Sequence, residues 1–230
     1  MRVGVTLPTF RDDAAFLDAA RRVEALGLDG AFVFDHLWPM GAPQRPALSC
    51  FPVLGALAAS TRSLCFGPLV ARVGLVPEEV LVAELLSLHR MAPGRLIAGL
   101  GTGDHLSAQE NLAYGIEFAP ADERRLALAA CARALSSAGV PVWVGGGATA
   151  TTELAADLGV AVNLWEGHPA AVASLAQRVE VTWGGPVAGD VAAVAEWLAE
   201  VQGAGASWAV CAWPKSMEAV AEAVALLGRR

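Results

Sequence analysis

The sequence is poor in basic side chains: its 230 residues include 15 arginines and a single lysine, Lys215, and the net charge is −7 at pH 7. No stretch of the chain gathers the positive charge that nucleic-acid binding requires, so no nucleic-acid partner is expected. No apolar run reaches about 18 residues without a charge, a proline or a glycine, so no membrane-spanning helix is expected. The chain enters a strand-like segment at once and lacks a secretory signal pattern, which predicts a cytoplasmic protein.

Cysteine and histidine are also scarce, and neither is spaced as a metal site would require. The cysteines are Cys50, Cys65, Cys131 and Cys211, and the histidines are His36, His89, His105 and His168. The cysteines form no close pair in sequence, so they are expected to be reduced packing residues in an unexported chain. The histidines show no ligand spacing, so no metal is predicted.

Apolar residues are abundant, at 55% of the chain against 17% charged residues. This excess favours a parallel sheet that is buried on both faces. Strand-like runs occur at residues 3–7, 31–34, 64–70, 96–100, 142–144, 160–164, 179–183 and 208–212. Helical patterns occur between them at residues 14–26, 51–59, 78–91, 123–136, 151–158, 169–177, 191–202 and 217–227.

Eight strands that alternate with helices predict parallel βαβ units, closed into a compact (β/α)8 TIM barrel. Such a barrel typically uses about 250 residues. An open doubly wound sheet is the alternative. Because no linker or low-complexity segment divides the chain, residues 1–230 are expected to form a single barrel domain.

The candidate site lies at the C-terminal ends of the predicted strands, because barrels of this kind build their active sites from the loops that follow the strands. Asp35-His36 follows the second strand, where a histidine can change charge near neutral pH and a neighbouring carboxylate can fix its tautomer. A histidine packed at the barrel rim is the alternative. Four tryptophans also follow strands, where aromatic walls would suit a planar ligand. They are Trp38, Trp165, Trp183 and Trp213.

Two glycine-rich turns follow other strands. Residues 145–149, Gly-Gly-Gly-Ala-Thr, lead into a helix, whose N–H groups and dipole could hold a phosphate. An ordinary tight turn is the alternative. Residues 101–104, Gly-Thr-Gly-Asp, could bring backbone close to a flat ring and place one carboxylate beside it. The alternative for this second turn is that Asp104 simply caps a helix.

Taken in order, these motifs resemble the luciferase-like superfamily of flavin monooxygenases and deazaflavin-dependent oxidoreductases. The matching segments are residues 26–30 leading to 35–36, 66–70, 77–95, 99–104, 110–111 with 113–115, and 141–147 with 154–155. The resemblance implies a (β/α)8 barrel that binds either FMN or coenzyme F420, a deazaflavin that carries hydride and does not activate oxygen. It also implies a homodimer that pairs through the helices at 51–59 and 78–91.

The Asp-His pair is most similar to the deazaflavin branch of that superfamily, which implies that His36 is a catalytic or substrate-orienting residue. The Gly-Thr-Gly-acid turn is also similar to that branch, which implies a proton-donating Asp104. The resemblance also places a non-prolyl cis peptide at Leu69-Val70. The residues predicted to bind the cofactor are Asp35, Leu69, Val70, Thr102, Gly103, Ser107, Gly145, Gly146, Gly147, Ala148 and Thr149. Those predicted to contact the substrate are Trp38, Arg72, Trp165 and Trp183.

The chain departs from the superfamily in lacking both the long insertions that cover the substrate and the basic residues that hold a phosphorylated one. The predicted function is therefore F420-dependent hydride transfer between the deazaflavin and a small, mainly uncharged organic substrate. One alternative is an FMN-dependent monooxygenase, which would need a flavin reductase as its partner. The other is a non-catalytic flavin-binding barrel protein.

Overall fold

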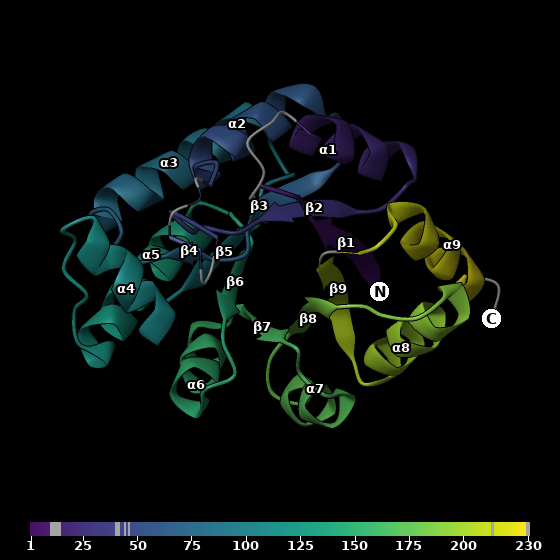
Figure 1. Ribbon diagram of the computed structural model, residues 1–230. Helices are drawn as coiled ribbons and strands as arrows, with labels where there is room; N and C mark the ends of the chain where they lie inside the picture. The colour runs from purple at the N-terminus through teal and green to yellow at the C-terminus, as the bar shows by residue number, and fades with distance from the viewer. Residues whose placement is uncertain (10–14, 40–41, 44, 46, 213, 229–230) are drawn as a thin grey trace.

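The computed structural model describes residues 1–9, 15–39, 42–43, 45, 47–212 and 214–228. Within these residues, nine parallel strands form one sheet that curls into a nearly closed barrel, and helices surround it (Figure 1). The strands are β1 (Arg2–Thr6), β2 (Gly30–Val33), β3 (Cys65–Pro68), β4 (Ala71–Arg72), β5 (Ala98–Gly101), β6 (Val142–Gly145), β7 (Ala161–Trp165), β8 (Val181–Pro186) and β9 (Ala206–Ala212). The helices are α1 (Ala15–Ala25), α2 (Cys50–Ser60), α3 (Glu78–Met91), α4 (His105–Ala113), α5 (Ala121–Ser137), α6 (Thr149–Leu158), α7 (Pro169–Ala176), α8 (Val191–Gly203) and α9 (Met217–Leu227). Within the described ranges, every helix is too short or too polar to cross a membrane.

The strand order confirms the predicted barrel. The strands follow the order β3-β2-β1-β9-β8-β7-β6-β5-β4, so the two edges of the sheet, β3 and β4, are consecutive in the chain. Phe66 of β3 also forms a parallel bridge with Leu96, shortly before β5, which brings the two edges together. The predicted third strand, residues 64–70, is divided into β3 and β4. The Leu69-Val70 peptide bond between these two strands is cis, which confirms that prediction.

The described helices coincide with the predicted helical patterns, with one exception. Helices α3 and α9 even begin and end at the predicted residues. The exception is α4, which follows β5 and was not predicted. Its buried side chains are the polar Ser107, Glu110 and Asn111, so no apolar stripe marks it in the sequence.

Three aromatic rings fill the interior of the barrel. The ring centroids of Phe32 and Trp143 lie 5.1 Å apart, and those of Trp143 and Trp208 lie 5.4 Å apart. A Cβ added at Gly30 would lie 2.9 Å from the Phe32 ring and 3.0 Å from the Trp208 ring, so glycine leaves the room that these rings need. Leu69 belongs to the same apolar cluster and carries it up to the C-terminal ends of the strands.

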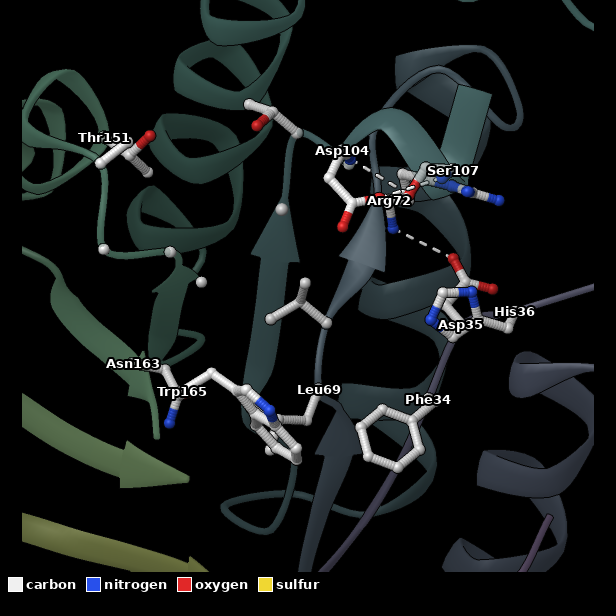
Figure 2. A pocket seen from close by; sticks show the side chains of 18 residues that line it. Phe34, Asp35, His36, Leu69, Arg72, Asp104, Ser107, Thr151, Asn163 and Trp165 are labelled. Atoms are coloured by element: carbon white, nitrogen blue, oxygen red, sulfur yellow. Dashed lines mark hydrogen bonds between the residues drawn. The ribbon is translucent and has the colours of Figure 1, made fainter. Parts of the chain in front are cut away.

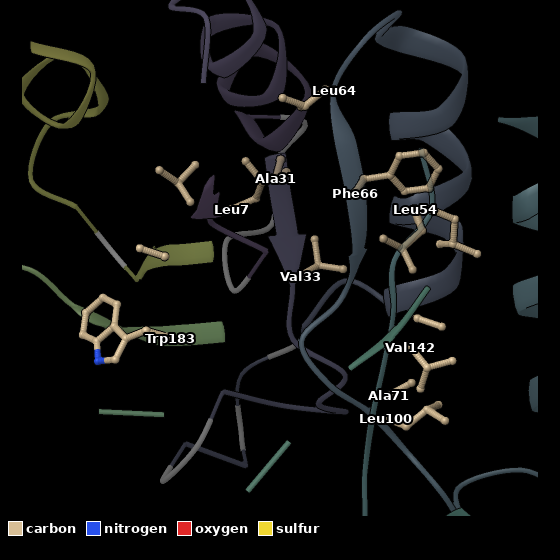
Figure 3. Packing of buried hydrophobic residues seen from close by; sticks show 14 of the residues in the cluster. Leu7, Ala31, Val33, Leu54, Leu64, Phe66, Ala71, Leu100, Val142 and Trp183 are labelled. Atoms are coloured by element: carbon tan, nitrogen blue, oxygen red, sulfur yellow. The ribbon is translucent and has the colours of Figure 1, made fainter. Parts of the chain in front are cut away.

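A second apolar layer lies between the strands and the surrounding helices (Figure 3). Successive side chains of a strand point to opposite faces of the sheet. On β2, therefore, Ala31 and Val33 belong to this outer layer, whereas Phe32 lies inside the barrel. This alternation decides which residues at the strand ends can reach the mouth of the barrel.

Candidate active site

A pocket of about 440 Å³ opens at the C-terminal ends of the strands (Figure 2). The predicted site residues that line it are Asp35, His36, Leu69, Val70, Arg72, Thr102, Gly103, Asp104, Ser107, Gly145, Gly146, Gly147, Ala148 and Trp165. Four lining residues were not predicted as site residues: Phe34, Gly101, Thr151 and Asn163. Three predicted residues do not line it: Thr149, Trp38 and Trp183.

The prediction that Trp183 contacts the substrate is wrong. Trp183 is 1% exposed and packs in the outer apolar layer, where its Nε1 donates a hydrogen bond to the carbonyl oxygen of Gly167 at 3.0 Å. The reason is that successive side chains of β8 point to opposite faces of the sheet, and Trp183 points to the outer face. Thr182, its neighbour, points inward instead and accepts a hydrogen bond from Asn163 Nδ2 at 2.9 Å.

Trp38 and Thr149 also lie away from the pocket wall. The Trp38 ring packs on Tyr114 at the end of α4, with 5.7 Å between ring centroids. Thr149 is exposed on the first turn of α6, and Thr151 lines the pocket in its place. Trp213, the fourth tryptophan predicted at a strand end, lies outside the described residues.

His36 and Arg72 meet a buried carboxylate that the sequence did not reveal as part of the site. Glu110 of α4 lies with Oε1 at 3.1 Å and Oε2 at 3.2 Å from His36 Nδ1. Its Oε2 also forms a 2.8 Å ion pair with Arg72 Nη2. Burial raises the pKa of Glu110, but the hydrogen bonds and positive charges of His36 and Arg72 outweigh it and hold that pKa below its ordinary value.

The placement of Arg72 does not support the predicted contact with the substrate. Arg72 lines the pocket, but its side chain is only 4% exposed. The three guanidinium nitrogens are buried, and one of them is engaged by Glu110. The backbone N–H of Arg72 donates to Asp35 Oδ2 at 3.0 Å, and burial raises the pKa of the Asp35 carboxyl. Arg72 therefore stabilises the wall of the pocket.

Asp104 caps α4. Its Oδ1 accepts hydrogen bonds from the backbone N–H groups of Leu106 and Ser107, each at 3.0 Å, and its own N–H donates to Ser107 Oγ at 3.2 Å. This reciprocal pattern is a capping box. Partial burial raises the pKa of Asp104, but these hydrogen bonds outweigh it and lower the pKa. Asp104 is thus held as a carboxylate on the pocket wall.

An arginine that the sequence did not single out supports the turn before Asp104. Arg124 of α5 donates from Nη1 to the carbonyl oxygens of Thr102 and Gly103. Its guanidinium lies over the Phe118 ring, 3.9 Å from the centroid. These hydrogen bonds from Arg124 to backbone carbonyl oxygens hold the turn on the pocket wall.

The N-terminus of α6 presents backbone amides beside the pocket. The amides of residues 147–150 have no recorded acceptor among the described residues, and Ala148 at the N-cap provides no side-chain cap. The amide of Gly146 is different, because it donates to the carbonyl oxygen of Asn163 at 3.2 Å. Unpaired amides at a helix N-terminus form an anion-binding site. Gly184-Gly185, the other glycine pair near a strand end, does not line the pocket.

A slot with apolar walls continues from this helix end. The rings of Phe34 and Trp165 meet edge to face, with centroids 5.6 Å apart, and Leu69 lies close to them (Figure 2). Val70 fills the space that two inward-facing glycines leave. A Cβ would lie 2.4 Å from the Val70 side chain at Gly101 and 2.7 Å from it at Gly145. Together these residues shape a narrow space that suits a planar ligand.

Proteins with similar sequences include F420-dependent glucose-6-phosphate dehydrogenases. The one from Microbacterium testaceum is 33% identical over 109 residues, which are 47% of this chain and 32% of that protein. The one from Beutenbergia cavernae is 36% identical over 85 residues, which are 36% of this chain and 25% of that protein. The matched part of this chain thus spans about a third or less of the length of these curated relatives.

Solved structures with the same fold cover almost the whole chain. An F420-dependent secondary alcohol dehydrogenase in complex with an F420–acetone adduct gives a TM-score of 0.84 at 12% identity, over 98% of both chains. The coenzyme F420 dependent tetrahydromethanopterin reductase of Methanopyrus kandleri gives 0.76 at 13% identity, over 97% of this chain and 96% of that one. A monooxygenase from Streptomyces bottropensis gives 0.74 at 15% identity, over 100% and 98%. These likenesses establish the fold.

The family is established by the sequence itself. The profile of the luciferase-like monooxygenases matches residues 1–130, which is more than half of the chain. The matched region includes His36, the cis peptide at Leu69-Val70, and the turn and helix that carry Asp104 and Glu110. This protein therefore belongs to the luciferase-like monooxygenase family.

Proposed function

We propose that this protein is an oxidoreductase that binds coenzyme F420 in the pocket and transfers hydride between it and a small, mainly uncharged organic substrate. The observation that carries the proposal is the pocket, where an anion-binding helix end, a narrow apolar slot and a histidine face one space. The F420-dependent dehydrogenases that match part of the sequence support this choice of cofactor over FMN.

The residues of the pocket fit such a cofactor at both of its ends. The unpaired amides of residues 147–150 would hold a phosphate on the cofactor tail, because they combine hydrogen-bond donors with the positive end of the α6 dipole. The slot bounded by Phe34, Trp165 and the Leu69-Val70 segment would hold the flat ring. The Val70 side chain packs against the inward-facing glycines of β5 and β6, where no other side chain would fit.

When bound, the deazaflavin supplies or accepts the hydride, and the side chains of the protein have to manage the accompanying proton. We assign the proton to His36, because an imidazole nitrogen can accept or donate a proton and because His36 lines the pocket. The lowered pKa of Asp104 favours a carboxylate that holds α4 and the preceding turn. A proton-donating Asp104, which the family resemblance implied, remains a prediction that this geometry does not favour.

The substrate class follows from the charges that face the pocket. Among the described lining residues, Arg72 is the single Lys or Arg, and Glu110 already engages its guanidinium. A phosphorylated substrate would therefore find no free cation among these described residues, whereas a small uncharged molecule would not need one. The charges of the pocket therefore favour a substrate unlike the one named for the glucose-6-phosphate dehydrogenases.

Equilibrium titration of the purified protein with F420 and with FMN tests the cofactor. We expect F420 to bind at least about tenfold more tightly, which corresponds to about 1.4 kcal/mol. Fluorescence titration at fixed ionic strength measures both dissociation constants. Tighter FMN binding would instead support an FMN-dependent monooxygenase with a separate flavin reductase. If neither compound binds, the proposed function is wrong.

We also propose that the protein is a homodimer that pairs through α2 and α3. An apolar groove runs between these helices and includes Phe51, Val80, Leu88 and Met91. Val80 is 43% exposed and Met91 is 60% exposed, and exposed apolar patches of this kind mark interaction sites. Light scattering should give twice the 23.7 kDa of one chain, and Met91→Glu should reduce it toward one chain. A single-chain mass for the unsubstituted protein at micromolar concentration would contradict the proposal.

A further inference from the structure

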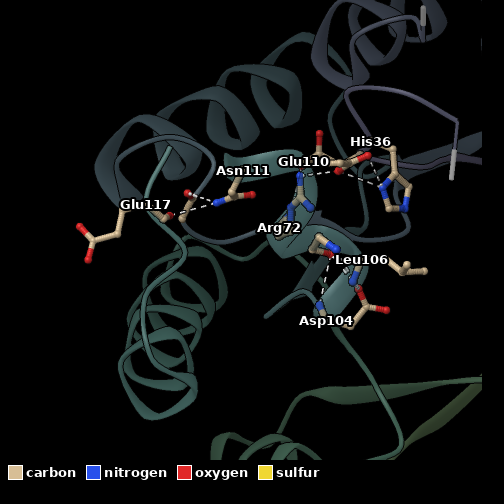
Figure 4. Close-up of polar contacts among 10 residues, drawn as sticks. His36, Arg72, Asp104, Leu106, Glu110, Asn111 and Glu117 are labelled. Atoms are coloured by element: carbon tan, nitrogen blue, oxygen red, sulfur yellow. Dashed lines mark hydrogen bonds and ion pairs between the residues drawn. The ribbon is translucent and has the colours of Figure 1, made fainter. Parts of the chain in front are cut away.

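A cluster of ionisable side chains in the pocket wall joins three elements. Glu110 comes from α4, Arg72 from β4, and His36 from the loop after β2 (Figure 4). The side chains of Glu110 and Arg72 are 2% and 4% exposed, whereas that of His36 is 19% exposed and lines the pocket. Glu110 itself does not line the pocket. It can therefore influence the pocket only through the lining residues that it contacts, His36 and Arg72, and of these His36 is the one to which we assign the proton.

The charge of Glu110 decides which ring nitrogen of His36 carries hydrogen. An ionised carboxylate can only accept hydrogen bonds. The lowered pKa of Glu110 keeps it ionised at neutral pH. The hydrogen in the 3.1 Å contact must therefore reside on His36 Nδ1. In a neutral imidazole with hydrogen on Nδ1, the other nitrogen, Nε2, accepts a proton.

Arg72 provides the positive charge that this arrangement requires. A buried carboxylate without a countercharge is strongly disfavoured. Arg72 Nη2 lies 2.8 Å from Glu110 Oε2, while Nε and Nη1 have no hydrogen-bond partner among the described residues. The Oδ1 atom of Asn111, also buried without such a partner, is turned toward the guanidinium (Figure 4). Arg72 thus compensates Glu110 from within the pocket wall.

We infer that Glu110, compensated by Arg72, is a positioning residue that holds His36 in its Nδ1–H tautomer and so makes Nε2 the atom that exchanges the substrate proton. The catalytic part of this inference rests on the proposed function. The tautomer part does not, since it concerns the protein without cofactor or substrate. If Glu110 paired with Arg72 only to support the fold, it would not decide which nitrogen of His36 carries hydrogen.

The tautomer is tested by 15N NMR of the imidazole rings, recorded without ligand at alkaline pH, where the rings are neutral. The His36 signals are assigned by their loss in His36→Ala. We expect hydrogen on Nδ1 in the unsubstituted protein. In Glu110→Gln we expect a mixture or the opposite tautomer, because an amide can either donate or accept. Hydrogen on Nε2 in the unsubstituted protein, or an unchanged tautomer in Glu110→Gln, would overturn the inference.

The catalytic part is tested with charge-matched variants of the F420-loaded protein. Glu110→Gln should lower kcat by about tenfold with little change in KM, because the partner of a functional histidine sets its orientation. This variant leaves Arg72 uncompensated, so it should also have a lower Tm. In Glu110→Gln with Arg72→Gln, both charges are absent, and we expect Tm to recover while kcat stays low. Recovery of kcat together with Tm would show that the ion pair only supports the fold.

The two tests separate failure of this inference from failure of the proposed function. If the protein does not turn over any substrate with F420, the NMR result still decides whether Glu110 sets the tautomer of His36. If turnover is found and the tautomer changes in Glu110→Gln without a fall in kcat, the role assigned to Nε2 is wrong.

Discussion

Replacing His36 by alanine is expected to lower kcat by about 100-fold or more while the protein stays folded. The substitution removes the group to which we assign the proton, but it leaves the cofactor site in place. Because the side chain is 19% exposed at the pocket wall, its loss opens space to solvent and creates no core cavity. Steady-state kinetics with F420 and a substrate found by screening small uncharged compounds measures the effect, and thermal melting checks the fold.

His105→Ala is the matched control for His36→Ala. His105 is exposed on the first turn of α4 and does not line the pocket. Its substitution should leave kcat within about twofold of the original value, since surface changes away from the site have small effects. An unchanged kcat in His36→Ala would contradict this role and support the alternative that His36 is only packed at the barrel rim.

Substituting Gly147 by valine is expected to weaken F420 binding by at least about tenfold. A Cβ at Gly147 would meet no atom within 4 Å, and its φ lies outside the left-handed region, so the fold tolerates a side chain there. The side chain would, however, crowd a phosphate at the amides of residues 147–150. One hydrogen bond to a charged group contributes about 1.5–3 kcal/mol, and each 1.4 kcal/mol is a factor of about ten in affinity.

The comparison that isolates the phosphate uses the deazaflavin ring compound without its phosphate tail. Its affinity should change little in Gly147→Val, whereas a folding defect would weaken both ligands. Gly159→Val is the matched control, because Gly159 ends the same helix, α6, at φ +65° with open space around it. This control should lower stability modestly and leave F420 affinity unchanged. Equal losses for the two ligands in Gly147→Val would place the phosphate elsewhere in the barrel.

Gly146 is a less informative position for this test. Its φ of +134° is one that side chains rarely adopt, so any substitution would strain the turn whether or not a phosphate binds. Its amide is also already engaged by the carbonyl oxygen of Asn163. The sequence predicted three equivalent glycines in this turn, and the structure distinguishes them by their backbone geometry.

Much of the site was predictable because its residues follow the strands directly. The C-terminal ends of parallel strands meet at one mouth, so Asp35-His36, the 101–104 turn and the 145–149 turn had to converge once the barrel was recognised. The resemblance to a known family added the cis peptide at Leu69-Val70, which the structure confirms. Predicting these residues required no knowledge of side-chain packing.

Two features could not be predicted without knowledge of side-chain packing, the position of Trp183 and helix α4. Alternation along β8 was readable in principle, but placing Trp183 required knowing which face of that strand turns inward, and the structure buries it at 1% exposure. Helix α4 has polar residues on its buried face, so the apolar periodicity that revealed the other helices was missing. Glu110 was noticed in the sequence only as part of a family motif.

Apart from α4 and the division of β3 from β4, the order of strands and helices followed from the sequence by itself, because local apolar periodicity determines it. The convergence of the candidate site on the strand ends also followed, because the C-terminal ends of parallel strands meet at one mouth. Only the tertiary structure decided how charges pair. His36 and Glu110 are 74 residues apart in the chain, and they meet because barrel closure folds α4 back against the loop after β2. A carboxylate, a guanidinium and an imidazole each favour water when alone. Their burial together is stabilised by their mutual contacts, and these exist only in the closed barrel.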